Sequence, residues 1–293
     1  MVDESITKEL LCTSGFMLVK VTYWGYNQIG LPFSFQIYMF YINNTFIGID
    51  PTAGQRPFSY VALDNELKLL ALGKGNIDDI LAFVAGQRKA MVAVCAPQRL
   101  NQGIMANPEV RQNLSPPPHT GRWENFRLAD YKLRMHWINI PQTPHKEKDC
   151  PNWMRKGFLL FRRLSDLDYK PYPDVSVERL SMEVYPHACY TVLLGVTPFL
   201  KLTLEGRIQR QLILYENGVD VSDPMRFFEE ITRHRLLSGN LPFESLCTPG
   251  ELDALVAAYT AWMISNRPDH ITLVGDPGEG QVVVPVSEMK ARY

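Results

Sequence analysis

The pattern of apolar and polar residues becomes regular from residue 45 onward. An apolar, β-branched run over 45–50 ends in Asp50 and leads into a Pro/Thr/Gly turn, which is typical of a buried strand that carries an acid at its end. Two more strand-like runs, 58–63 and 67–72, are joined by a turn-rich connection. The pattern predicts a three-strand antiparallel meander, with Asp50 either facing a site or capping the following turn.

A helix and a buried strand are predicted next. Asn76 is a favoured N-cap residue, and the apolar positions of 77–84 recur at helical spacing until Gly86. The continuous apolar run over 90–97 is typical of a strand that is covered on both faces. This β-β-β-α-β order places the end of the new strand, and with it Cys95, beside Asp50.

Residues 98–172 are rich in proline and contain two predicted helices, at about 123–137 and 152–165. Arg127, Asp130 and Arg134 form a charged stripe on the first helix at positions i, i+3 and i+7. Such a stripe is either a solvated face or a contact for phosphate groups. We interpret the segment as a helical insertion.

Two further acids lie at positions where an element begins or ends. Glu183 lies near the end of a strand-like run, 177–185, which Pro186 follows. It is either an acid at the end of a sheet or a surface residue of an edge strand. Asp253 lies early in a helix that begins at the capping box of Thr248 and Glu251, where the helix dipole alone also favours an acid. Between them, a helix over about 203–217 is expected to present Arg207 and Arg210 outward.

Residues 1–44 form an N-terminal extension of uncertain status. Their longest apolar stretch is interrupted by polar residues and is shorter than the about 20 residues that span a bilayer, and the features of a signal peptide are missing. Met39 lies just ahead of the first regular strand. This position motivates the hypothesis that the natural start is Met39 and that the preceding residues are dispensable.

Composition and charge restrict the class of protein. Among 293 residues, 46% are hydrophobic and 21% are charged, which is typical of a globular soluble protein, and one elaborated domain is the expected organisation. The formal net charge of -1 means that any surface for nucleic acid is local. Five scattered cysteines without a CxxC pair predict neither a disulfide framework nor a structural zinc site, and we expect a cytoplasmic protein without a membrane anchor.

An ordered set of motifs within 46–285 carries a resemblance to a known family. The motifs are Gly48-Ile49-Asp50, Val94-Cys95-Ala96-Pro97, the stripe from Arg127 to Arg134, Trp153-Met154 with Gly157, Glu183-Val184-Tyr185-Pro186, Glu205-Gly206-Arg207, Asp253-Ala254-Leu255 and Gly275-Asp276-Pro277. The chain resembles an uncharacterised prokaryotic family of predicted nucleases with a ribonuclease-H-like fold. The resemblance implies an α/β domain over 45–293, in which helices flank a mixed five-stranded sheet and the insertion covers about 98–172.

The resemblance also implies a divalent-metal site at the rim of the sheet. The expected catalytic residues and ligands of Mg²⁺ or Mn²⁺ are Asp50, Glu183 and Asp253, whose carboxylates should converge on a shared ion. The expected phosphate-binding or substrate-binding residues are Arg127, Asp130, Arg134, Arg207 and Arg210. Relatives commonly carry Asp where this chain has Cys95, which is a poor ligand for a hard ion. The site is therefore expected to bind a single metal, to recruit Asp276 or Glu279 as an accessory acid beside Cys95, or to have lost activity.

These residues predict a metal-dependent nuclease that hydrolyses phosphodiester bonds of DNA or RNA. The alternative is a non-catalytic module of the same fold that binds nucleic acid or protein, which Cys95 and the near-neutral charge favour. A phosphotransferase is a weaker alternative, because no Gly-rich phosphate loop follows the first regular strand and the Gly-rich turn at 275–280 lacks the GxxxxGK[ST] pattern. The oligomeric state is left open.

Overall fold

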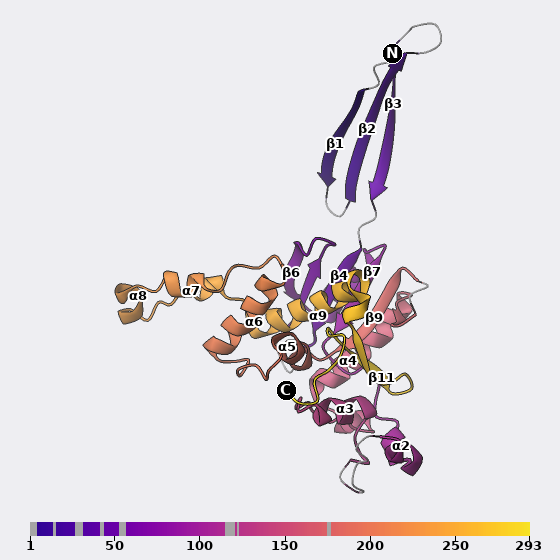
Figure 1. Cartoon of the computed structure of the whole chain (residues 1–293), viewed down its shortest axis with the longest axis vertical. Helices are drawn as coiled ribbons and strands as arrows, with labels where there is room; N and C mark the ends of the chain where they lie inside the picture. The colour runs from indigo at the N-terminus through magenta and orange to yellow at the C-terminus, as the bar shows by residue number, and fades with distance from the viewer. Residues whose placement is uncertain are drawn as a thin grey trace. The chain divides into compact units, whose positions relative to one another are not determined.

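The computed structural model describes residues 5–13, 16–26, 32–41, 44–52, 57–114, 121, 123–174 and 177–293, with side chains from residue 44 onward. The chain divides into two compact units, Met1–Asn44 and Thr45–Tyr293. In the first unit, β1 (Ser5–Thr13), β2 (Phe16–Tyr26) and β3 (Pro32–Tyr41) form an antiparallel sheet in this order (Figure 1). The sequence pattern assigns no elements here, so these strands are a finding of the structure.

A mixed sheet of eight strands is the centre of the second unit. Its order is β10 (Thr272–Asp276), β11 (Gly280–Val284), β9 (Arg179–Val184), β7 (Ala90–Val94), β4 (Thr45–Asp50), β5 (Phe58–Leu63) and β6 (Leu69–Gly75), with the short β8 (Lys170–Pro171) also paired to β9. The expected number of five strands was therefore too low. The hairpin of β10 and β11 extends the sheet beyond β9, and local periodicity does not reveal which strand a hairpin joins.

The predicted meander and crossover are present in this sheet. β5 pairs antiparallel with both β4 and β6, whereas β7 runs parallel to β4 on its other side. α1 (Ile77–Ala85) makes the crossover, and Asn76 closes its N-terminus in a capping box with Asp79. Because β4 and β7 are parallel, with Ile49 opposite Val94, their carboxyl ends meet at one edge of the sheet.

Helices cover both faces of the sheet (Figure 1). α9 (Pro249–Asn266) packs against β4 and β5, and its own outer side meets α5 (Pro186–Leu194) and α6 (Leu204–Glu216). A Cβ atom on Gly48 would lie 1.9 Å from the carbonyl oxygen of Ala254, so glycine is required for this close approach of helix to strand. The approach places the first turns of α9 at the carboxyl end of β4.

The opposite face is covered by α1 and by α4 (Asn152–Asp166), whose Leu160, Phe161 and Leu164 are buried against the sheet. The segment predicted as an insertion therefore supplies part of the central core. The first of the two helices predicted in this segment corresponds to α3 (Leu128–Met135), which is shorter than expected and packs on β10. Trp137 lies beyond α3 with 58% of its surface exposed.

The remaining elements are short. They are η1 (Ile104–Ala106), α2 (Pro108–Gln112), η2 (Glu147–Asp149), α7 (Arg226–Glu229), α8 (Arg233–Leu237), η3 (Phe243–Ser245) and η4 (Pro268–His270). α7 and α8 extend away from the sheet and its helices (Figure 1). None of the helices in the described part of the chain combines the length and the apolar character that a membrane crossing requires.

Candidate functional site

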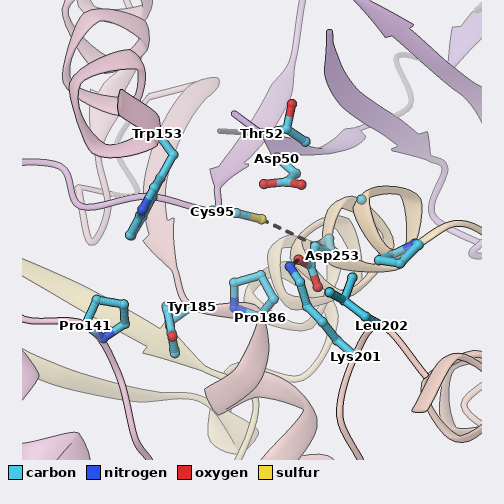
Figure 2. Close-up of a pocket in the computed structure, with 12 residues that line it drawn as sticks. Asp50, Thr52, Cys95, Pro141, Trp153, Tyr185, Pro186, Lys201, Leu202 and Asp253 are labelled. Atoms are coloured by element: carbon cyan, nitrogen blue, oxygen red, sulfur yellow. Dashed lines mark hydrogen bonds and ion pairs between the residues drawn. The ribbon is translucent and has the colours of Figure 1, made fainter. Parts of the chain in front are cut away.

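Asp50 and Asp253 line the same cavity, of about 400 Å³, at the carboxyl end of β4 (Figure 2). Along β4, Phe46 packs in the core on the α9 face while Ile47 and Ile49 pack on the other face, so the alternation of a strand directs Asp50 towards α9. Asp253 projects from the second turn of α9, which Gly48 allows to approach. Two acids that are distant in the sequence thus face one space.

The surroundings of Asp50 disfavour the charged form of its carboxyl group. Burial, and then the charge of Asp253, raise its pKa from 3.8 to about 7, although Lys201 acts in the opposite direction. Among the described residues, none donates a hydrogen bond to this carboxylate. A carboxylate that is desolvated and close to a second acid is typical of a group that meets a ligand.

Lys201 partly compensates the two acids. It reaches from the loop between α5 and α6, and its Nζ lies 2.7 Å from Oδ2 of Asp253. Burial raises the pKa of Asp253, and the nearby ammonium opposes that rise. Burial lowers the pKa of Lys201, but Asp253 outweighs this effect and raises it, so Lys201 is cationic. Two carboxylates and one ammonium group therefore line the same cavity.

Cys95 lies between the two acids at the end of β7. Its Sγ donates a hydrogen bond to the backbone carbonyl of Asp253, at 3.5 Å. Burial first, and then the charges of Asp50 and Asp253, raise the pKa of this thiol well above its ordinary value. The thiol is therefore neutral, and its role here is that of a weak donor rather than of a thiolate ligand or nucleophile.

Aromatic side chains form the opposite wall of the cavity. Trp153, from the first turn of α4, and Tyr185, just after β9, stand across the cavity from Asp253 and Lys201 (Figure 2). The sequence pattern does not single out Lys201. Its signal is a lone cation within the apolar run Phe199-Leu200-Lys201-Leu202, ahead of the N-cap Thr203.

Glu183 lies on the opposite face of the sheet. In β9, Leu180, Met182 and Val184 point into the core against α9, so alternation directs Glu183 away from it. Its two carboxylate oxygens accept hydrogen bonds from Arg127, at 2.8 and 2.5 Å, and one of them also accepts from the amide of Gln98. The expected convergence of three carboxylates is therefore not observed.

Arg127 and Asp130 belong to the same buried network. Arg127 is 1% exposed and also donates to Asp130, whose second oxygen accepts from the amide of Thr143. Burial lowers the pKa of Arg127, but the charges of Glu183 and Asp130 raise it by a larger amount. The pKa of Arg127 is therefore above its ordinary value, and the side chain stays positively charged. Neither residue faces the cavity that contains Asp50, and their ion pairs leave no free group for a phosphate.

The other predicted residues also have internal partners. Arg134 donates to the backbone carbonyl of Ile140, Arg207 to those of Leu246 and Cys247, and Arg210 to those of Phe199 and Gly206. Glu279 is fully buried and accepts from the amides of Gln102, Ile104 and Leu128, while Asp276 accepts from Gly278 within the β10–β11 turn. Neither accessory acid lines the cavity that contains Asp50.

The donor set suits a hard divalent cation that takes further ligands from solvent or substrate. Within the described residues, no group of three or more His, Cys, Asp or Glu side chains is placed to hold a metal ion. Mg²⁺, however, is commonly bound through one or two carboxylates together with waters and substrate phosphates. Asp50 and Asp253 provide this number of oxygen ligands, and a cation between them would relieve their mutual repulsion.

The chain matches no curated protein and no solved structure. A family model described as "Protein of unknown function (DUF429)" matches residues 48–279. The matched region begins within β4 and ends in the turn between β10 and β11, so it contains both Asp50 and Asp253. The chain therefore belongs to this family of proteins of unknown function.

Proposed function

We propose that the protein hydrolyses phosphodiester bonds of nucleic acid with the help of Mg²⁺ or Mn²⁺. The observation that carries this proposal is the pair formed by Asp50 and Asp253, which face one cavity while the pKa of Asp50 is raised to about 7. Two desolvated carboxylates that repel each other form an unfavourable arrangement, which Lys201 compensates only in part, and a divalent cation held between them would make the arrangement favourable.

Each residue has a defined part in this proposal. Asp50 and Asp253 would hold the cation, and the cation would supply an activated water and neutralise charge on the leaving oxygen. Lys201 releases Asp253 and donates to an oxygen of the substrate phosphate. Cys95 keeps the backbone of Asp253 in place through its hydrogen bond. Glu183 acts at a distance, because its contact with Arg127 and the amide of Gln98 fixes the loop that follows β7.

The order of the strands supports a ribonuclease-H-like assignment. β6, β5 and β4 form the antiparallel meander, and β7 and β9 then continue the sheet in parallel on the other side of β4. This is the arrangement that the resemblance implies for the five central strands. β8, β10 and β11 are additions at the edge formed by β9.

Calorimetry with Mn²⁺ tests the proposal directly. We expect the wild-type protein to bind Mn²⁺ and to cleave labelled DNA or RNA in its presence, and we expect Asp50→Asn and Asp253→Asn to lose at least about tenfold in affinity, which is 1.4 kcal/mol. Asp269→Asn is the matched control, because Asp269 is exposed and lies outside this cavity. A folded wild-type protein that binds no Mn²⁺ and cleaves neither nucleic acid would overturn the proposal.

The ion pair of Lys201 with Asp253 favours a second candidate function, a non-catalytic module that binds nucleic acid. In this case the ammonium group of Lys201 takes the place of a metal ion beside Asp253 permanently. Lys201→Met separates the two functions. A hydrolase is expected to retain or gain Mn²⁺ affinity in this variant, since the competing ammonium is removed. A binding module is expected to bind no Mn²⁺ in either form.

A further inference from the structure

A second cavity, of about 490 Å³, adjoins the one that contains Asp50. The two cavities share Tyr185, Pro186, Lys201 and Asp253, so they meet at the ion pair. Each has a volume in the range of small-molecule sites.

The second cavity is cationic where the first is acidic. Lys201 and Arg210 line it, and the acid among its lining residues is Asp253, which already pairs with Lys201. His187 also lines it, and burial, followed by Arg210 and Lys201, lowers the pKa of this imidazole, so a neutral ring faces the space. This balance of charge attracts an anion.

The loop that carries Lys201 is anchored to α6. A Cβ atom on Gly206 would lie 1.9 Å from the carbonyl oxygen of Leu200, so the loop lies directly on the helix. Arg210 donates to the carbonyl of Phe199, and Gln209 accepts from its amide. The backbone of Lys201 is thus fixed at the junction, and its half-exposed side chain is the part that can change partners.

The wall formed by Trp153 and Tyr185 offers flat rings in the first cavity (Figure 2). Bases of single-stranded nucleic acid stack on such rings with little regard to sequence. A base within a duplex is already stacked and paired, so it must leave the duplex before it can use this wall.

We propose that the substrate is single-stranded nucleic acid that lies across both cavities. One base stacks against Trp153 and Tyr185, the scissile phosphate lies at Asp253 and Lys201, and the next phosphate enters the cationic cavity beside His187. This assignment rests on the proposed function for the cleaved bond, while the stacking of the base and the phosphate in the cationic cavity involve no metal.

The test measures the anisotropy of a fluorescein-labelled single-stranded oligonucleotide, and of the same strand in a duplex, in the presence of EDTA. We expect the single strand to bind at least about tenfold more tightly than the duplex, and Trp153→Leu to weaken this binding about tenfold. Trp153→Phe retains a ring and is expected to bind almost as wild type. Trp137→Leu, an exposed tryptophan outside both cavities, is the control, and thermal melting verifies that each variant is folded.

The cationic cavity has its own test. Thr197 is exposed and lines it, so Thr197→Glu places a negative charge beside the expected phosphate, and we expect about tenfold weaker binding of the single strand. Ser238→Glu, on the exposed end of α8, adds the same charge elsewhere and is expected to have no such effect.

Failure of this inference differs from failure of the proposed function. Equal binding of duplex and single strand, or a folded Trp153→Leu protein that binds as wild type, overturns the inference even when cleavage depends on Asp50. Loss of single-strand binding in Trp153→Leu supports the inference, and it does so even if the protein cleaves nothing with Mn²⁺.

Discussion

The thiol of Cys95 donates to the backbone carbonyl of Asp253, and this contact joins the end of β7 to the second turn of α9. Cys95 occupies the place where the resemblance leads us to expect an aspartate. Its neutral side chain borders the two acids and adds no charge to them. The site therefore has two carboxylates, and the single substitution Cys95→Asp would add a third.

Cys95→Asp is predicted to strengthen Mn²⁺ binding. A third carboxylate beside Asp50 and Asp253 supplies a hard oxygen ligand, and we expect the affinity measured by calorimetry to rise about tenfold. Without metal, the same substitution buries another negative charge and should lower the melting temperature. Cys95→Ser is the control, which keeps a small neutral donor. Unchanged Mn²⁺ affinity in a folded Cys95→Asp protein would contradict a metal site at this position.

The raised pKa of Asp50 predicts how stability depends on pH. Because this pKa is about 7 in the folded protein and ordinarily 3.8, the folded state holds the proton more tightly than the unfolded state. The contribution of Asp50 to the free energy of unfolding is thus fully present below about pH 4. It is lost as pH rises to about 7, and the free energy of unfolding falls by no more than about 1.4 kcal/mol per pH unit.

Urea denaturation at pH 5 and pH 8, in EDTA, measures this effect. We expect the free energy of unfolding of the wild type to fall more between the two pH values than that of Asp50→Asn, which does not titrate. Added Mn²⁺ should recover the loss at pH 8 in the wild type and not in the variant. Parallel curves for the two proteins would show that Asp50 titrates normally.

Glu183→Gln is predicted to destabilise the fold and to spare the metal site. The substitution leaves the buried guanidinium of Arg127 with Asp130 as its remaining acid, and loss of one partner of a buried pair costs about 3–5 kcal/mol. Glu66→Gln is the control, because Glu66 pairs with Lys68 on the surface and should contribute almost nothing. Urea denaturation gives the stability. Folded Glu183→Gln protein that no longer binds Mn²⁺ would indicate that Glu183 is a ligand.

The elements with strong local signals were predictable from the sequence. The meander, α1, β7 and α9 follow from periodicity and capping residues, and the structure confirms them. The meeting of Asp50 with the end of β7 follows from the parallel crossover. The attachment of β10 and β11 to β9 was not predictable, since pairing between distant strands is decided by tertiary packing.

The position of Glu183 illustrates what motif order alone misses. Leu180, Met182 and Val184 alternate in the sequence, and this alternation already places Glu183 on the face opposite theirs. The partner that buries it, Arg127, is 56 positions away and sits in a stripe that resembles a solvated helix face. Charge patterning on one helix does not reveal that the face is covered by the β10–β11 turn and the loop after β7.

The close contact of β4 with α9 leads to the last prediction, that Gly48→Ala displaces the helix. A Cβ atom at position 48 would lie 1.9 Å from the carbonyl oxygen of Ala254, and backbone on both sides prevents a small adjustment. We expect a loss of about 1–3 kcal/mol or more in the free energy of unfolding, as for overpacked cores, together with loss of Mn²⁺ binding as Asp253 moves away from Asp50. Gly86→Ala is the matched control, because its nearest atom lies at 3.4 Å and its φ of -70° suits alanine. Gly48→Ala protein with wild-type stability and Mn²⁺ affinity would show that the spacing of β4 and α9 does not set the distance between the two carboxylates.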